Sequence, residues 1–232
     1  MFGKILDYIA SKNNLDENVR KKIRNFPKVR TRLVRMVVKG GSIGEGREKM
    51  IKNFITFFGC GKIKTGSGTL ASFASVIVWF MITLFFIHIE IPQIYENIFW
   101  ATLLGLIFLY SLLLIPIYSA DLEEKDHPSI VIDEVVGQIL ALCLTYPFIR
   151  EYYIDQSWFL TKIIMFAHMF LCFILFRVLD IAKPLIIGWV DQNVKGSFGV
   201  MLDDIIAGVV AAAINIAFFL FYKNSIIQLH GY

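Results

Sequence analysis

The chain has 232 residues, of which 56% are hydrophobic and 15% aromatic, and its mean hydropathy is +0.63. Soluble domains average roughly 45–50% apolar residues by a similar count, so the composition indicates a protein exposed to lipid rather than an ordinary soluble domain. The three cysteines, Cys60, Cys143 and Cys172, have no paired spacing, which excludes a complete disulfide framework and a recognisable zinc motif.

The formal net charge of +4 is distributed unevenly along the chain. Residues 1–53 carry 14 Lys and Arg against 5 Asp and Glu, whereas residues 54–232 carry 9 against 14. The basic part precedes any long apolar run, so we expect no secretory signal peptide, whose apolar region lies within the first ~30 residues. Basic residues ahead of a first span are typical of a cytoplasmic N-terminus. We expect no nucleic-acid partner, because no aromatic interleaving or known binding motif accompanies the charge.

Apolar residues recur at helical spacing within the basic segment, for example at Val19, Ile23 and Phe26. Basic residues fill the intervening positions, which predicts an amphipathic helix on anionic lipid. A solvated tail that only fixes the topology is an alternative that the pattern leaves open. We therefore expect two parts, a basic amphipathic N-terminal extension over residues 1–53 and a membrane-embedded domain over residues 54–232.

Five apolar stretches follow in chain order, each close to the ~20 residues that a helix needs to cross the hydrocarbon core. They cover about residues 70–91, 98–120, 130–149, 158–182 and 200–222. The third stretch begins near two acids, and its full crossing stays open. We expect an all-α, polytopic membrane helix bundle with four or five membrane-inserted helices.

Threading these stretches from a cytoplasmic N-terminus gathers the acidic groups of the second half near one membrane face. The linkers near 121–129 and 183–199 then face inward and carry Lys125, Lys183 and Lys195, a weak positive-inside bias. The glycine-rich segment ahead of the first stretch lies on the same side. Ionisable groups beside hydrocarbon are costly, so their default interpretation is a functional site. Groups far apart in the sequence thus meet in one plane, which favours a single site.

Two pairs of adjacent acids stand at the start of apolar stretches, Asp133 with Glu134 and Asp203 with Asp204. Adjacent carboxylates repel each other unless a cation or a proton lies between them. In a helix Asp133 and Glu134 point ~100° apart, so they could address two ions, or one ion and a water. Mg²⁺ prefers oxygen ligands and usually takes one or two carboxylates plus substrate phosphate. These four acids are candidate metal ligands, and an acidic first turn that favours the helix dipole is the simpler alternative.

Polar residues near these acids are candidates for binding an anionic substrate. Arg177 and Asp180 lie on adjacent turns of one helical face, where a structural salt bridge and a site role are both open. Lys183 precedes a proline that ends the helix, so we expect it to face a phosphate or headgroup at the membrane surface. Asn193 could orient a ligand or cap a turn. Thr69 begins the first stretch, where backbone N–H groups could bind phosphate, or where it is a plain N-cap.

The histidines give weaker signals. His127 could donate a proton to a leaving oxygen, but a loop histidine beside a proline is more often incidental. His88 and His168 lie in apolar runs, and the sequence suggests no partner for either.

Four segments, taken together, resemble the phosphatidylglycerophosphatase A family in its order and spacing over about residues 54–222. They read SIVIDEVVG (129–137), FRVLDIAKP (176–184), DQNV (191–194) and GVMLDDIIAG (199–208). The resemblance implies a Mg²⁺-dependent phosphatase of bacterial phospholipid biosynthesis, a multi-pass protein of the inner (cytoplasmic) membrane with its active site near the cytoplasmic face. Its substrate would be phosphatidylglycerol phosphate, which loses its terminal phosphate to give phosphatidylglycerol.

The resemblance also implies roles for individual residues. The family's acidic motifs, with their catalytic role, fall on Asp133, Glu134, Asp180, Asp203 and Asp204. Its substrate-binding companions fall on Arg177, Lys183, Asn193 and Thr69. The chain departs from the family in three places: the loop before Thr69 is poorer in proline, a second proline after Pro184 is missing, and residues 1–53 exceed the usual extension.

We expect Mg²⁺, held by the acidic pairs at 133–134 and 203–204, to polarise the phosphate oxygens while Arg177 and Lys183 neutralise charge on the transferring group. Direct water attack is preferred to a covalent aspartyl-phosphate, because the Asp-x-Asp signature of one familiar phosphatase class is absent. The alternative function is a small membrane transporter or cation channel with an acidic cytoplasmic-side site, which would spread charges across the membrane depth. The oligomeric state stays open.

Overall fold

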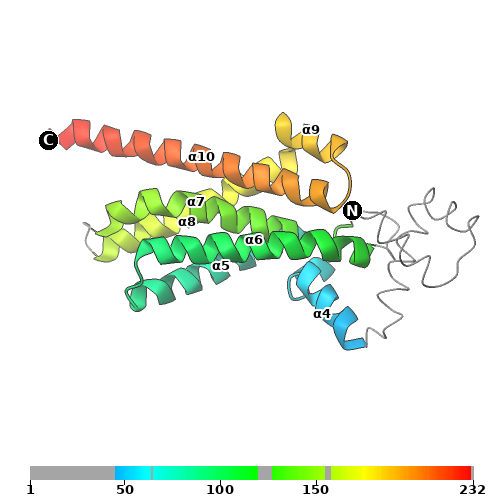
Figure 1. Ribbon diagram of the computed structural model, residues 1–232. Coiled ribbons are helices and arrows are strands. Elements are labelled where there is room, and N and C mark those ends of the chain that lie inside the picture. The colour runs from blue at the N-terminus through cyan, green and yellow to red at the C-terminus, as the bar shows by residue number, and fades with distance from the viewer. Residues whose placement is uncertain (1–44, 64, 120–126, 155–157, 231–232) are drawn as a thin grey trace, which may run out of the picture.

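The computed structural model describes residues 45–63, 65–119, 127–154 and 158–230, and all regular elements within these ranges are helices (Figure 1). In chain order they are α4 (Glu45–Ile55), the 3₁₀ turn η1 (Cys60–Lys62), α5 (Ser67–His88), α6 (Gln93–Tyr118), α7 (Ile132–Ile154), α8 (Trp158–Ala182), α9 (Ile186–Asn193) and α10 (Ser197–His230). The all-α prediction is confirmed. The amphipathic helix expected in residues 1–53 lies largely outside the described residues, and α4 runs across the expected boundary.

Five of the described helices, α5, α6, α7, α8 and α10, are long and apolar enough to cross a membrane. The third of them, α7, meets this criterion over Ile132–Arg150, so the chain offers five candidate spans rather than four. Of the α7 span 67% is buried inside the protein, against 22–33% of each other span. Helix α7 is therefore the central helix, and most polar residues of its Ile132–Arg150 span are buried among other helices.

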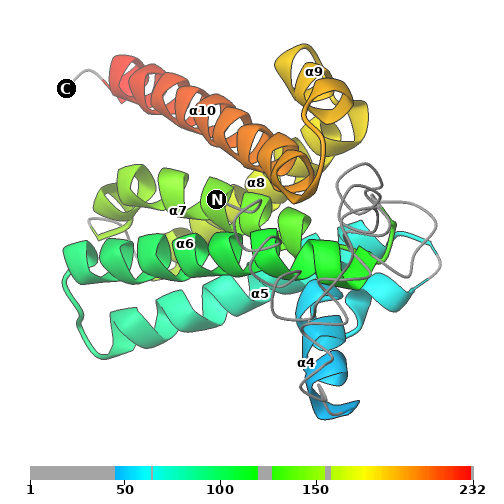
Figure 2. The same ribbon diagram turned by 45° about the vertical axis from the view of Figure 1, so that its right-hand side comes forward.

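The helices form one bundle with two distinct ends (Figures 1 and 2). Helices α4 and α9 lie at one end, here called the α9 end, and the C-terminus extends past the other, here called the far end. Helices α5, α7 and α10 begin at the α9 end, and α6 and α8 finish there. Helix α7 packs against α5, α6, α8 and α10, and its contact with α10 is the most extensive.

Two glycines allow α7 and α10 to touch backbone to backbone. A Cβ on Gly208 would collide with the carbonyl of Gly137, and one on Gly137 would collide with the carbonyl of Asp204 and the ring of Phe176. Asp133 lies one turn before Gly137, and Asp204 lies one turn before Gly208. Because both helices begin at the α9 end, this close approach brings the two acids near each other.

Two buried polar clusters connect helices away from the α9 end. At the far end Arg150 of α7 donates to Glu96 of α6 at 3.2 Å, and Glu96 is only 1% exposed. Within the bundle, the ring nitrogens of His168 lie 3.2 Å from Thr145 Oγ1 on α7 and 3.3 Å from Asn215 Nδ2 on α10. The expectation that His168 has no partner is wrong, because its partners lie on other helices and folding alone brings them together.

The linker expected near 183–199 contains a short helix, α9, that the sequence analysis does not predict. The chain reverses ahead of it through a φ of 43° at Lys183. Helix α9 buries Ile187 and Val190 against the bundle and exposes Trp189. An exposed tryptophan on a short helix at the end of a membrane bundle suits the boundary between lipid and water.

Candidate active site

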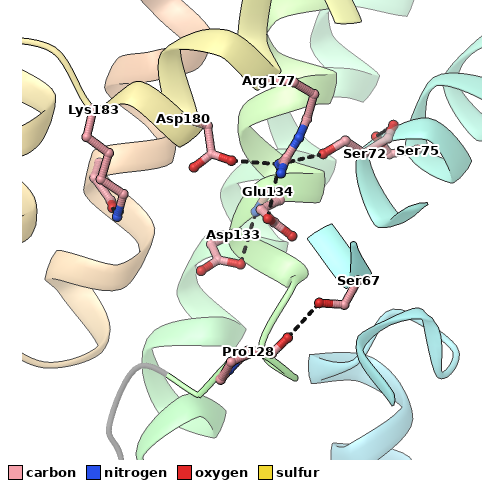
Figure 3. Close-up of polar contacts among 10 residues, drawn as sticks. Ser67, Ser72, Ser75, Pro128, Asp133, Glu134, Arg177, Asp180 and Lys183 are labelled. Atoms are coloured by element: carbon pink, nitrogen blue, oxygen red, sulfur yellow. Dashed lines mark hydrogen bonds and ion pairs between the residues drawn. The ribbon is translucent and has the colours of Figure 1, made fainter. Parts of the chain in front are cut away.

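A cavity of about 370 Å³ lies at the α9 end, where the starts of α5, α7 and α10 meet the last turns of α8. Its charged lining consists of Asp133, Glu134, Asp180, Asp203, Asp204, Arg177 and Lys183. The other lining residues are Gly66, Ser67, Gly68, His127, Pro128, Ile130 and Val200. Figure 3 shows Arg177 and Asp180 of α8 reaching towards Glu134 of α7, with Asp133 beside them.

The cavity contains most of the residues that the sequence analysis singles out. All five candidate catalytic acids line it, as do Arg177 and Lys183. Thr69 and Asn193 are exposed and lie outside the lining within the described part of the chain. The side chain of Asn193 donates to the carbonyl of Trp189 at 2.7 Å. This contact fits the alternative in which Asn193 caps a turn.

Arg177 is held by residues from three helices. Its Nη1 donates to Glu134 Oε1 of α7 at 3.0 Å, to Asp180 Oδ2 of α8 at 2.6 Å, and to Ser72 Oγ of α5 at 3.4 Å. The salt bridge with Asp180 is therefore present, and both partners also line the cavity. Breaking a buried ion pair is costly, because the remaining charge is left without a partner. The pairs with Glu134 and Asp180 therefore hold the Arg177 guanidinium in place.

Lys183 connects α9 to the start of α10. Its Nζ donates to Asp191 Oδ1 at 2.6 Å and to Asp203 Oδ2 at 2.9 Å. Burial lowers the pKa of Lys183, but the hydrogen bonds to both carboxylates and their charges raise it more, so this pKa lies above its usual range. Lys183 thus stays protonated at physiological pH and lines the cavity as a permanent cation.

The cavity lining carries more acid than base, five carboxylates against the two cations. Asp133 is 7% exposed and Asp204 is 3% exposed, and Asp204 interacts electrostatically with Asp133, Asp180 and Asp203. Carboxylates this close favour a bound cation or proton. Among the described residues no three His, Cys, Asp or Glu side chains make a preformed metal cluster. Mg²⁺ sites completed by substrate phosphate need only one or two protein carboxylates, so this all-oxygen donor set fits them.

The start of α5 forms another part of the cavity lining. Gly66 has a φ of 72° and caps the helix, which begins at Ser67, ahead of the expected position. Ser67 therefore lines the cavity in place of Thr69, and its Oγ donates to the carbonyl of Pro128 at 2.9 Å (Figure 3). A Cβ on Gly68 would overlap the carboxylate of Glu134, so a larger residue here would require that carboxylate to move. The first N–H groups of α5 are suited to an anion.

His127 also lines the cavity, although a loop histidine beside a proline is a weak signal in the sequence. Its Nδ1 is 2.8 Å from Ser129 Oγ, and that oxygen is 2.9 Å from the hydroxyl of Tyr118. The sequence offers one weak signal for this arrangement, which is that Ser129 follows His127 by two positions. The contact with Tyr118 could not be predicted, because Tyr118 belongs to another helix.

Comparison with known proteins gives consistent matches. The family model described as phosphatidylglycerophosphatase A matches residues 53–219. Phosphatidylglycerophosphatase A of Escherichia coli K12 is 32% identical over 158 residues, which are 68% of this chain and 76% of that protein. The protein of the same name from Haemophilus influenzae Rd is 31% identical over 160 residues, 69% of this chain and 83% of that protein.

A further relative carries a different name. A protein of Bacteroides thetaiotaomicron, provisionally named a phosphatidylinositol-3-phosphatase, is 32% identical over 158 residues, 66% of this chain and 84% of that protein. No solved structure matches the chain.

Proposed function

The chain belongs to the phosphatidylglycerophosphatase A family, and on this premise we propose that it hydrolyses the terminal phosphate of phosphatidylglycerol phosphate to give phosphatidylglycerol. The observation that carries the proposal is the cavity at the α9 end, where five carboxylates surround Arg177 and Lys183. Carboxylates and fixed cations at the end of a membrane bundle are the chemistry that a lipid phosphomonoesterase needs.

The location proposed for the protein is the bacterial inner membrane, with the cavity near the cytoplasmic face. The basic residues of the first 53 positions precede the first candidate span, and the span begins at the α9 end. Basic segments favour the cytoplasmic side, so a cytoplasmic N-terminus would put the cavity on that side too.

We propose that Mg²⁺ is held by Asp133, Glu134, Asp203 and Asp204. The support is the excess of acid over base in the cavity lining and the all-oxygen donor set. When bound, the ion would offset the charge of the phosphate and polarise its oxygens. A phosphate dianion would otherwise be repelled by these carboxylates.

The side chains themselves would then act on the bound phosphate. Arg177, held by Glu134 and Asp180, would neutralise charge on the transferring phosphoryl group, and Lys183 would do so from the other side of the carboxylates. A carboxylate would orient the attacking water. The water oxygen forms the new bond to phosphorus, the bond to the glycerol oxygen breaks, and a proton passes from the water to the departing alcohol.

The test is phosphate release by the purified protein in detergent–lipid micelles, with and without Mg²⁺. We expect release from phosphatidylglycerol phosphate that stops on chelation and returns with Mg²⁺. Phosphatidylinositol 3-phosphate and phosphatidic acid serve as comparison substrates, since one relative carries a phosphatidylinositol-3-phosphatase name. Faster release from either comparison lipid would overturn the headgroup assignment.

A small transporter or cation channel is the alternative. The cavity acids gather at the α9 end, whereas a cation path would distribute acids through the membrane depth. Cation uptake into proteoliposomes without any phosphate release would favour transport and overturn the phosphatase.

A further inference from the structure

Three residues from two segments form a hydrogen-bonded chain beside the cavity. Tyr118 ends α6, and His127 and Ser129 lie in the turn that leads into α7. The hydroxyl of Tyr118 is 2.9 Å from Ser129 Oγ, which is 2.8 Å from His127 Nδ1. The backbone N–H of Ser129 also donates to His127 Nδ1 at 3.2 Å.

These contacts fix the tautomer of His127. A backbone N–H always donates, so Nδ1 must accept and cannot carry a proton. Ser129 Oγ then also donates to Nδ1, so the hydroxyl and the backbone N–H share the one lone pair of Nδ1. Ser129 Oγ in turn accepts from the hydroxyl of Tyr118. The proton of the neutral imidazole therefore lies on Nε2, which acts as a hydrogen-bond donor.

His127 lies in the lining of the cavity. The residues that line the cavity beside it include Ser67 and Gly68 at the start of α5. Ser67 Oγ donates to the carbonyl of Pro128 at 2.9 Å and so ties the α5 start to the same turn (Figure 3). His127 thus lines the same cavity as the start of a long helix, while its Nδ1 is bound by Ser129.

We propose that His127 is a substrate-binding residue whose Nε2–H donates to an oxygen of the substrate phosphate, with Ser129 and Tyr118 as its positioning residues. This inference rests on the proposed function. The carboxylates can reach a phosphate only through a cation or a proton, whereas the Nε2–H of His127 contacts it directly. His127 holds the phosphate as a hydrogen-bond donor and does not supply the proton to the leaving oxygen.

Two substitutions separate the Nε2 donor from the rest of the ring. The amide of Asn occupies the position of Nδ1 and ends short of Nε2, whereas the amide nitrogen of Gln reaches the position of Nε2 and still donates. We expect His127→Asn to raise KM for phosphatidylglycerol phosphate about tenfold, with kcat within about threefold of wild type. Inhibition by inorganic phosphate weakens by the same factor. His127→Gln stays within about threefold of wild type on both measures.

Two further measurements identify the mechanism behind the KM change. His88→Asn, at the exposed end of α5 on the far side, is the matched control and leaves KM unchanged. Ser129→Ala raises KM by a smaller factor than His127→Asn. The ¹⁵N spectrum of selectively labelled histidine should show the Nε2–H pattern for His127 in wild type and in Ser129→Ala alike, because the variant keeps the backbone N–H that donates to Nδ1. An Nδ1–H pattern in wild type would overturn the inference.

The outcomes distinguish this inference from the proposed function. If the wild-type protein releases phosphate and His127→Asn matches it in KM and in phosphate inhibition, the inference is overturned and the function stands. The inference is also overturned if His127→Asn and His127→Gln raise KM equally and lower thermal stability equally. That result would mean that the His127 ring stabilises the fold and does not bind the phosphate. If the wild-type protein releases no phosphate, the proposed function fails, and direct binding of inorganic phosphate to wild type and His127→Asn decides the inference alone.

Discussion

The two ends of the bundle differ in their ratio of acidic to basic side chains. At the far end one acid, Glu96, meets one arginine, Arg150, at 3.2 Å. At the α9 end the cavity lining has five carboxylates for Arg177 and Lys183. A paired acid and base satisfy each other and leave no net charge for a ligand. The acid-rich end retains negative charge, so its electrostatics change when a cation and a phosphate enter together.

The difference has a consequence for stability and activity. Side chains at the far end are expected to hold the fold together, so their loss lowers stability more than turnover. Side chains in the cavity repel one another, and neutralising one acid relieves part of this repulsion. Functional sites commonly gain stability when such groups are removed. Substitutions at the two ends of the bundle test this separation.

Neutralising an acid at the α7–α10 contact has the largest expected effect on turnover. Asp133→Asn or Asp204→Asn should lower phosphate release at least about 10³-fold, because each removes a carboxylate from the proposed Mg²⁺ site without changing size. The thermal midpoint should stay the same or rise. Turnover is measured by phosphate release and stability by thermal melting in the same detergent, and an unimpaired variant would remove that residue from the site.

The second prediction concerns the glycine contact that brings these acids together. Gly208→Ala places a Cβ against the carbonyl of Gly137, so α7 and α10 must separate. We expect turnover to fall about 10²-fold and stability by about 1–3 kcal/mol, the usual cost of overpacking.

The matched control for this prediction is Gly105→Ala in α6, where an added Cβ meets nothing within 4 Å. It should leave turnover unchanged and stabilise the helix slightly, since alanine is the better helix former. Equal effects of the two substitutions would mean that the helix contact does not position the acids.

The third prediction is that a substitution at the far end lowers stability and leaves turnover almost unchanged. Arg150→Met leaves Glu96, which is 1% exposed, without its cation, and this should cost about 3 kcal/mol of stability. Turnover per folded molecule should stay within about twofold, because the pair lies at the end of the bundle opposite the cavity. Glu96→Gln with Arg150→Met should recover part of the lost stability. A large loss of turnover at unchanged stability would contradict the distinction between the two ends.

The helices were predictable because lipid imposes a simple rule on them. A spanning helix needs about 20 apolar residues, so the five stretches stand out from composition alone. Helix α7 also meets the length and hydropathy criterion for a span, although it begins with Asp133 and Glu134. Those acids are tolerated because neighbouring helices bury most of this span. Helix α9 was missed since its eight residues owe their helical form to the packing of Ile187 and Val190 against the bundle.

The candidate site was predictable where charge was the signal and not where backbone geometry decided. Acids beside hydrocarbon attract attention in any sequence, and the cavity contains all five that were singled out. Ser67 replaces Thr69 at the cavity because the positive φ of Gly66 starts the helix earlier. Glu96 and Arg150 each lie in or next to a linker in the sequence, and only the fold makes them a buried pair.

The smallest effect is expected at the outer edge of the cavity, where Lys183 pairs with Asp191. Asp191 is exposed and Lys183 retains Asp203 as a partner, so Asp191→Asn should change turnover by less than about threefold. The folded-state pKa of Lys183 is raised, so its ion pairs contribute full stability below its ordinary pKa of roughly 10.4 and lose it only as pH rises through the raised value.

The thermal midpoint should therefore show no step from Lys183 between about pH 7 and pH 9, in wild type and in Asp191→Asn alike. Above about pH 10 both midpoints should begin to fall, and that of Asp191→Asn should fall by less in total, because its Lys183 has lost one of the two carboxylates that raise its pKa. If Asp191→Asn instead abolished turnover, Asp191 would belong to the active site. The cavity would then hold its acids in still greater excess over base, and the contrast with the balanced pair at the far end would be larger.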